Sequence, residues 1–152
     1  MLSLGLRFHV ISVKKRAVRA ALIDNTSEGV VACTEHVLDG SASQARQARD
    51  ARDWLRSALA AHLDVGSAVL FEADRGPRSS DTDAARQRLR IEGAVLTAAL
   101  DHIPIVDVRN GKRIGDLVGG SKEAALVLGV ATGAQTPYVE AAAAALCAIK
   151  LA

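Results

Sequence analysis

The chain has 152 residues, of which 49% are hydrophobic and 3% aromatic, and its formal net charge is +2. This length and composition fit one folded domain, residues 1–152, with an aliphatic core, and they exclude a disordered chain. The scarcity of aromatic residues also argues against the stacking platforms of single-strand nucleic-acid binders.

The cysteines and the two terminal segments indicate in which compartment we expect the protein. Cys33 and Cys147 are far apart and form no CxxC motif, so we expect free thiols in a reducing compartment and no zinc site. The N-terminus lacks the basic and apolar segments of a signal peptide, and Lys150 interrupts the apolar C-terminal stretch. We therefore expect a cytoplasmic protein with no membrane partner.

The N-terminal part of the chain alternates in the manner of β-strands. In LSLGLRFHVISV, leucines and Phe8 fall on one face, whereas Arg7 and His9 fall on the other. AVRAALID and VVACTEHVL have the look of two more strands, separated by the turn-rich NTSEG. The three segments predict an antiparallel meander. They also raise the question of why so apolar a strand carries an arginine and a histidine side by side on its second face.

The rest of the chain alternates helices and strands. Apolar residues recur at threes and fours over 43–62 and 81–102, which predicts two helices, the second capped by Asp81 or Thr82. The apolar runs GSAVLFEAD and IPIVDV predict strands between and after them.

The C-terminal segment begins with RNGKRIGDLVGG, which we expect to be irregular with a short strand. Ser121 is suited to cap a following helix, and Pro137 to begin the last one. The resulting order, β-β-β-α-β-α-β-α-α, predicts an α/β fold with a mixed five-stranded sheet flanked by helices. The alanine run at 141–145 would let the last helix approach that sheet closely.

Five segments, taken in order, resemble the RuvC-type Holliday junction resolvases of the RNase H-like superfamily. They are LSLGLRFHVISV with the following RAALID, AVLFEADRG, RIEGAVLTAAL, IPIVDVRNGKRIG with the following GGSKEAALVLGV, and TPYVEAAAAALCA. The resemblance covers nearly the whole chain and implies an RNase H-like fold.

Members of that family cut DNA with two magnesium ions held by four acidic positions. The resemblance places the second position at Glu72, which ends the fourth strand, and the fourth at Glu140, which begins the last helix. Arg7 stands at the first position and Pro137 at the third, so two carboxylates are lost. Arginine cannot ligate magnesium, and two-metal hydrolysis needs oxygen ligands to both ions. The resemblance thus implies a degraded site.

This substitution suggests an answer to the question raised by the first strand. We expect Arg7 to lie with Glu72 and Glu140 at one end of the sheet, its guanidinium occupying the space of the metal, with no metal or other cofactor bound. In the alternative interpretation, the register differs and Arg7 faces solvent.

The resemblance also implies contact with duplex or branched DNA. Its basic, glycine-containing stretch and the neighbouring edge supply six candidate cations: Arg75, Arg78, Arg109, Lys112, Arg113 and Lys122. A solvated run of charges is the simpler alternative. By the same analogy the helix 81–102 forms a homodimer contact through Ile91, Val95, Leu96 and Leu100, although such a stripe also serves to pack a helix on a sheet.

Three function hypotheses follow from these residues. The first is a RuvC-like protein that is inactive or impaired as an enzyme and binds nucleic acid or a protein partner. The second is an active magnesium-dependent endonuclease with a rearranged set of ligands: Glu72, Asp74, Asp107 and Glu140. The third is a scaffold protein with no role in nucleic-acid binding. The lost acidic positions favour the first hypothesis.

Overall fold

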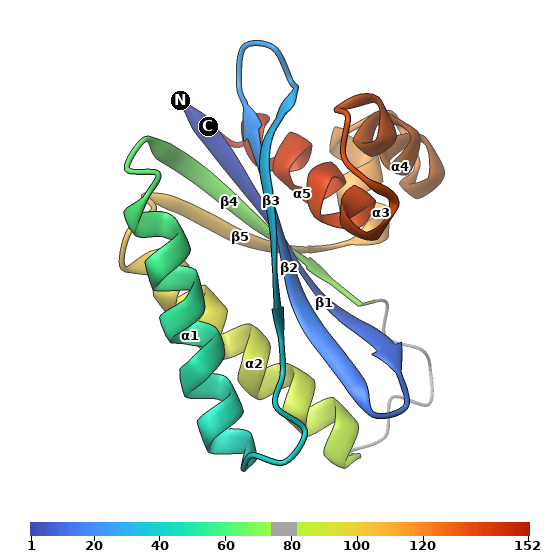
Figure 1. The fold of residues 1–152 in the computed structure, drawn as a ribbon. Helices are drawn as coiled ribbons and strands as arrows, with labels where there is room; N and C mark the ends of the chain where they lie inside the picture. Colours follow the sequence, from blue (N-terminus) through green and yellow to red (C-terminus); the bar gives the residue numbers. More distant parts are fainter. Residues whose placement is uncertain (74–81) are drawn as a thin grey trace.

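The computed structural model describes residues 1–73 and 82–152, and its described part is an α/β fold built on a five-stranded mixed sheet (Figure 1). The strands are β1 (Leu2–Ser12), β2 (Lys15–Asp24), β3 (Val30–Val37), β4 (Val65–Glu72) and β5 (Ile105–Asn110). Their order across the sheet is β3-β2-β1-β4-β5. β1, β2 and β3 pair antiparallel, whereas β4 and β5 add in parallel, which confirms the predicted sheet.

Helices cover both faces of the sheet (Figure 1). One face packs against α1 (Gln44–Ala60) and α2 (Asp83–Leu100). The other face packs against α5 (Val139–Ile149), which is accompanied by α3 (Gly111–Leu117) and α4 (Lys122–Ala131). The period-2 pattern of β1 explains this division, because Leu4, Leu6 and Phe8 enter the core under α1 and α2 while the alternate residues face α5.

The caps predicted at Thr82 and Ser121 are confirmed, and Ser43 is a cap that the sequence analysis did not name. Ser43, Thr82 and Ser121 each accept a hydrogen bond from the backbone N–H three residues later, at 3.2, 3.1 and 3.1 Å. Pro137 lies in a short 3₁₀ turn, Thr136–Tyr138, that leads directly into α5, so it precedes the helix rather than opening it.

The prediction for residues 111–117 was wrong, because this stretch is the helix α3 and not irregular chain with a strand. Asn110 caps the helix by accepting a hydrogen bond from the Arg113 N–H at 3.0 Å. Ile114, within the helix, is fully buried. Its glycines suggested a loop. They instead permit close packing, since a Cβ on Gly115 would lie 2.3 Å from the backbone carbon of Ser121.

The approach of α5 to the sheet depends on small residues on both sides. Ala141 to Ala145 are at most 1% exposed, as the alanine run predicted. Directly beneath them, a Cβ on Gly5 of β1 would lie only 1.7 Å from the carbonyl oxygen of Ala141. Only glycine fits at this contact, which fixes the beginning of α5 over the middle of β1. No helix in the described part of the chain is long and apolar enough to cross a membrane.

Candidate functional site

A row of five side chains crosses the whole sheet at the middle of β1. Arg7 pairs with Arg19 of β2 on one side and with Phe71 of β4 on the other. The row continues from Arg19 to Glu35 of β3, and from Phe71 to Arg109 of β5. Directly opposite residues in a sheet point to the same face, and Phe71 belongs to the core under α5. The row therefore lies on the face covered by α5.

Arg7 is the centre of this row and is bound on three sides. Its Nε donates to Oε2 of Glu140 in the first turn of α5, and its Nη1 donates to the carbonyl oxygen of Phe71 at 3.1 Å. The guanidinium also lies over the Phe71 ring, with Cζ 4.7 Å from the ring centroid. The side chains of Arg7 and Glu140 are 17% and 34% exposed. These contacts confirm that Arg7 meets Glu140, and they exclude the alternative in which Arg7 faces solvent.

Arg19 is a second buried arginine in the row, and the sequence analysis did not name it. Its residue is 8% exposed, its Nε donates to Oε2 of Glu35 at 2.6 Å, and its Nη1 donates to the carbonyl oxygen of Pro137 at 3.2 Å. Pro137, where the resemblance implies a lost acidic position, therefore lies beside the row. An arginine inside an otherwise apolar strand was the available signal, because such a residue needs a partner when it is buried.

The third arginine of the row is also matched with an acid. Arg109 Nε donates to Oδ2 of Asp107 at 2.8 Å, and the other oxygen of Asp107 accepts the N–H of Val108 at 2.8 Å. Each of the arginines at 7, 19 and 109 thus holds one carboxylate: Glu140, Glu35 and Asp107. The face where the resemblance implies a negatively charged metal site is close to neutral.

Glu72 lies at the predicted end of β4 but not on the predicted face. The pairing of β4 with β5 is regular through Phe71–Arg109 and Glu72–Asn110, so the alternation of the strand continues to its last residue. Glu72 therefore falls on the same face as Leu70, which belongs to the core under α1 and α2. The predicted cluster is confirmed for Arg7 and Glu140, whereas Glu72 occupies the alternate face.

Phe71 takes the place on the site face that a carboxylate ending β4 would need. It is 1% exposed, and two cations approach its ring, with Lys122 Nζ 5.8 Å and Arg7 Cζ 4.7 Å from the ring centroid. Cations over an aromatic face are attracted to its negative potential. The phenyl ring thus supports the two charges without supplying a ligand for a metal.

An open pocket of about 360 Å³ lies against this cluster. Its lining residues are Arg7, His9, Arg19, Thr136, Pro137 and Glu140. Burial and the positive charge of Arg19 hold the pKa of His9 below its ordinary value, although Glu140 opposes the shift. The histidine is therefore favoured in its neutral form.

The residues described do not fit the magnesium ions that the resemblance implies. No group of three or more His, Cys, Asp or Glu side chains among residues 1–73 and 82–152 is arranged to hold a metal ion. Of the rearranged ligand set, Glu140 and Asp107 are each bonded to an arginine. Glu72 faces away from both, and Asp74 lies outside the described residues.

Four of the six candidate DNA-binding cations lie in the described part of the chain, and they fall into two groups. Lys112 and Arg113 are exposed on α3, and we refer to them as the α3 cations. Arg109 and Lys122 instead contact other side chains of the face covered by α5. Arg109 is bonded to Asp107, and Lys122 packs over Phe71. Arg75 and Arg78 lie outside the described residues.

No protein-family model and no curated protein matches this chain. Two solved structures of RuvC from Thermus thermophilus do. The first is described as the RuvC structure and is 12% identical with a TM-score of 0.71; the second, RuvC in complex with Holliday junction substrate, is 13% identical with a TM-score of 0.72. Each match covers 97% of this chain and 92% of the other.

The chain has a RuvC-type, RNase H-like fold. At this level of identity the match establishes the arrangement of the strands and helices and nothing about the side chains.

Proposed function

We propose that this chain is a single RuvC-like domain that does not cleave DNA and that binds nucleic acid through its phosphate backbone. The observation that carries the first half is the contact of Arg7 with Glu140. A guanidinium already bonded to the carboxylate occupies the position from which an acid would reach two metal ions. The free thiols of Cys33 and Cys147 are consistent with the cytoplasmic location that we propose.

The electrostatic cost of placing a metal beside Arg7 is large. At an effective dielectric constant of about 20, a dication about 4 Å from a guanidinium is repelled by about 8 kcal/mol. Such a cost corresponds to about six orders of magnitude in affinity. Glu140 would also have to leave Arg7, which is 17% exposed and would then lack its charged partner.

Cleavage of a synthetic four-way junction in the presence of Mg²⁺ or Mn²⁺ tests this half of the proposal. We expect no products from the unmodified protein. Products that disappear in both the Glu140→Gln and the Glu72→Gln variants would establish the alternative, an active endonuclease with a rearranged acidic site. Products that persist in both variants would indicate a contaminating nuclease.

The α3 cations support the second half of the proposal. Lys112 and Arg113 are exposed, and among the described residues neither makes an ion pair with a carboxylate. They follow β5 directly, on the side of the molecule where β4 also ends (Figure 1). A matched structure contains RuvC bound to a Holliday junction, which makes branched DNA the first ligand to test here.

Fluorescence anisotropy with labelled duplex and four-way junction DNA measures this binding. Each phosphate contact should contribute about 0.9 to the slope of log affinity against log salt. The Lys112→Gln variant should lower the slope by about that amount, whereas Lys150→Gln, which alters a lysine near Glu28, should not. Absence of binding to either DNA at low salt would favour the scaffold hypothesis.

We also propose that α2 mediates a homodimer, through a stripe different from the one predicted. Ile91 and Val95 are fully buried against the sheet, so they are not available to a partner. Leu89 and Leu100 are 50% and 63% exposed, and Leu96 between them is only partly buried. Nothing lies within 4 Å of a Cβ added at Gly93. The residues at 89, 93, 96 and 100 follow the 4-3-4 spacing of a helix-pairing seam. A second copy presents the same seam, as a two-fold contact requires.

A further inference from the structure

A groove opens at the end of the molecule where the β1–β2 hairpin turns and α1 and α2 begin. It consists of two hollows of about 340 and 470 Å³ that share Arg16, Gly40, Gln47 and Gln87 in their walls. Lys14, in the hairpin turn, lines the first hollow. We refer to these five residues as the hairpin groove. It is separate from the pocket beside Arg7, which shares none of its lining residues.

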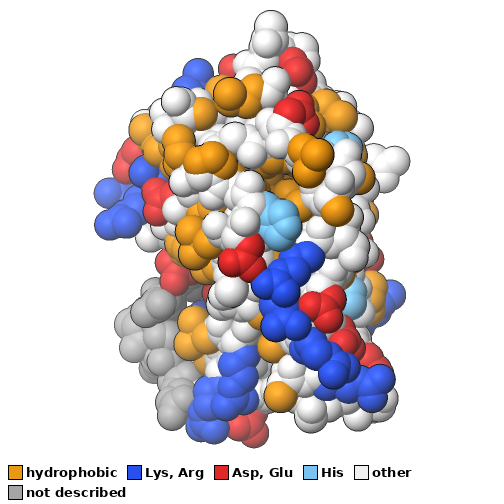
Figure 2. Space-filling model, turned by 90° about the vertical axis from the view of Figure 1, so that its left-hand side faces the viewer, with side chains coloured by type: hydrophobic (Ala, Val, Ile, Leu, Met, Phe, Trp, Pro, Cys, Tyr) orange, Lys and Arg blue, Asp and Glu red, His pale blue; other side chains and the backbone are white. Residues whose placement is uncertain are grey.

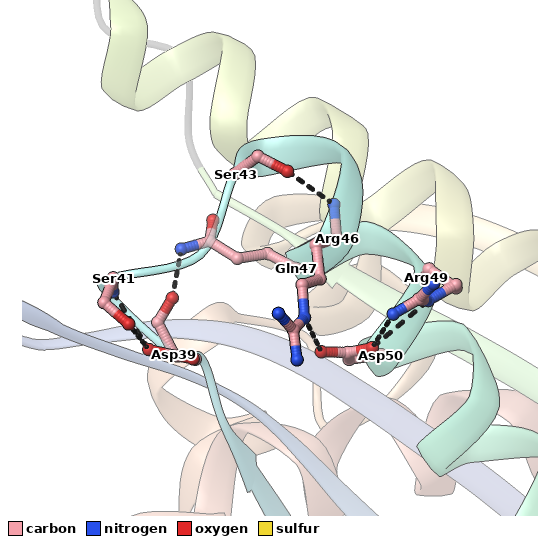
Figure 3. A network of polar contacts seen from close by, with 7 residues as sticks. All are labelled: Asp39, Ser41, Ser43, Arg46, Gln47, Arg49 and Asp50. Atoms are coloured by element: carbon pink, nitrogen blue, oxygen red, sulfur yellow. Dashed lines mark hydrogen bonds and ion pairs between the residues drawn. The ribbon is translucent and has the colours of Figure 1, made fainter.

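Two buried glutamines form the floor of the hairpin groove. Gln47 and Gln87 are 4% and 8% exposed, and Gln87 Nε2 donates to Oε1 of Gln47 at 2.7 Å. Gln47 Nε2 in turn donates to the carbonyl oxygen of Asp39 at 2.7 Å, a contact visible in Figure 3. Arg16 Nη1 donates to the remaining oxygen, Oε1 of Gln87. Both amide oxygens are therefore occupied as acceptors, while each NH₂ group retains a second hydrogen to donate.

The cations of the hairpin groove differ from most others on this protein. Figure 2 looks onto the side of α1 and shows basic side chains with acidic ones beside them. The α1 arginines are paired in this way: Arg46 and Arg49 with Asp50, Arg52 with Asp53, and Arg56 with Asp101. In the described part of the chain, Arg16 bonds to an amide rather than to a carboxylate, and Lys14 makes no ion pair.

The groove therefore offers donors with little competition from acids. Asp83 lines the larger of the two hollows, but its carboxylate forms an ion pair with Arg86 at 3.1 Å. The Asp39 carboxylate is held by the N–H and hydroxyl of Ser41, at 2.9 and 2.6 Å. What remains are the ammonium group of Lys14, the unused N–H groups of Arg16 and the two amide hydrogens. A tetrahedral oxyanion accepts hydrogen bonds in several directions and suits such a set.

We propose that the hairpin groove binds a phosphate group of a nucleic-acid backbone. This inference rests on the proposed nucleic-acid binding and extends it to a second contact. Figure 1 shows α3, the end of β4, the β1–β2 turn and the beginning of α2 along one side of the molecule. A strand that passes along this side and touches the α3 cations would reach Lys14 and Arg16 farther along. The groove then fixes the direction in which the nucleic acid crosses the protein.

The first experiment detects the phosphate in the groove directly. The side-chain amide signals of Gln47 and Gln87 are followed by ¹H–¹⁵N NMR during titration with inorganic phosphate, with potassium chloride at equal ionic strength as the reference. We expect saturable shifts with phosphate in the unmodified protein and in Lys150→Gln, and at least about threefold weaker binding in Lys14→Gln. Shifts no larger than those caused by chloride would overturn the proposal.

The second experiment separates free phosphate from a nucleic-acid backbone as the source. In the duplex titration, Lys14→Gln should lower the salt slope by about 0.9, in addition to the effect of Lys112→Gln. A fourfold rise in salt should then weaken the binding of the variant about 3.5-fold less than that of the unmodified protein. Arg16→Lys, which keeps the charge, should leave the slope unchanged.

The outcomes distinguish this inference from the proposed function. A lower slope in Lys112→Gln but not in Lys14→Gln would leave nucleic-acid binding intact and overturn the groove as a contact. Shifts with inorganic phosphate in a protein that binds no duplex or junction would show an anion site unrelated to nucleic acid. In that case both the proposed nucleic-acid binding and this inference would fail.

Discussion

The interaction of Arg7 with Glu140 should contribute measurably to the stability of the fold, and a double-mutant cycle can isolate it. The Arg7→Met variant removes a charge-assisted hydrogen bond worth about 1.5–3 kcal/mol, a bond to the Phe71 carbonyl worth about 1 kcal/mol, and a cation–π contact worth about 0.5–1 kcal/mol. Methionine recovers part of the packing of the side-chain stem. We therefore expect a net loss of about 3 kcal/mol in the free energy of unfolding.

The second arm of the cycle is Glu140→Gln, which keeps an oxygen acceptor for Arg7 but removes the charge. We expect it to cost about 1 kcal/mol, and the double variant to show a coupling of about 1.5 kcal/mol. The control pair is Arg52 and Asp53, whose Nη2–Oδ1 distance is 2.9 Å but whose side chains are 37% and 53% exposed. Its coupling should be below about 0.5 kcal/mol.

Urea denaturation of the single and double variants of both pairs supplies the free energies. The difference in burial between the two pairs is what the measurement tests. A coupling at Arg7 and Glu140 no larger than that of the control pair would mean that the contact is a loose surface ion pair. A guanidinium held so loosely would not occupy the place of a metal ion.

Three further predictions concern packing, titration and assembly. Gly5→Ala should lower the free energy of unfolding by about 3 kcal/mol or more, because its Cβ would lie 1.7 Å from the Ala141 carbonyl oxygen. Gly93→Ala, where nothing lies within 4 Å of the added Cβ, should raise the free energy of unfolding by about 1 kcal/mol. Thermal melts of the two variants measure both changes. His9 has a pKa below its ordinary value when folded, so the unfolded chain binds more protons as pH falls below about 6.5 and stability declines from pH 8 to pH 5. His9→Gln should reduce that decline, and an unchanged pH profile would contradict the assignment. Leu100→Glu should shift sedimentation equilibrium toward the monomer, whereas Leu63→Glu, at a residue that is 90% exposed outside the stripe, should not.

The sequence predicted the fold well because its information is local and periodic. The alternation in β1 and the caps at Thr82 and Ser121 belong to single elements and were confirmed. The helix α3 was missed for a tertiary reason. Its glycines weaken a helix in isolation, and they are explained only by the approach of α4, which no local pattern reveals.

The site was harder to predict because it depends on register between strands. The contact of Arg7 with Glu140 follows from matched positions, and it was confirmed. The row that joins Arg19 and Glu35 to Arg7 requires the pairing of three strands, which the sequence does not specify residue by residue. The same limit applies at the end of β4, where a shift of one residue decides whether Phe71 or Glu72 faces α5.

That one-residue difference leads to a prediction about which changes would create a metal site. A metal shared with position 7 needs its other ligands on the same face, and the register places position 71 there, opposite Arg7. We therefore expect Arg7→Asp with Pro137→Asp to bind Mn²⁺ weakly, through these two carboxylates and Glu140. Adding Phe71→Glu should raise the affinity at least about tenfold, because a fourth carboxylate joins the set.

Calorimetric titration with Mn²⁺ tests this order, with circular dichroism to confirm that each variant is folded, since Phe71 is 1% exposed. The deciding control is Glu72→Gln in the Arg7→Asp, Pro137→Asp background. If the strand alternation is correct, this change leaves the affinity for Mn²⁺ unaltered, because the side chain lies on the face of α1 and α2. A loss of binding in that control would show instead that Glu72 reaches the site, and that its match to the second acidic position of the resolvases holds despite the register.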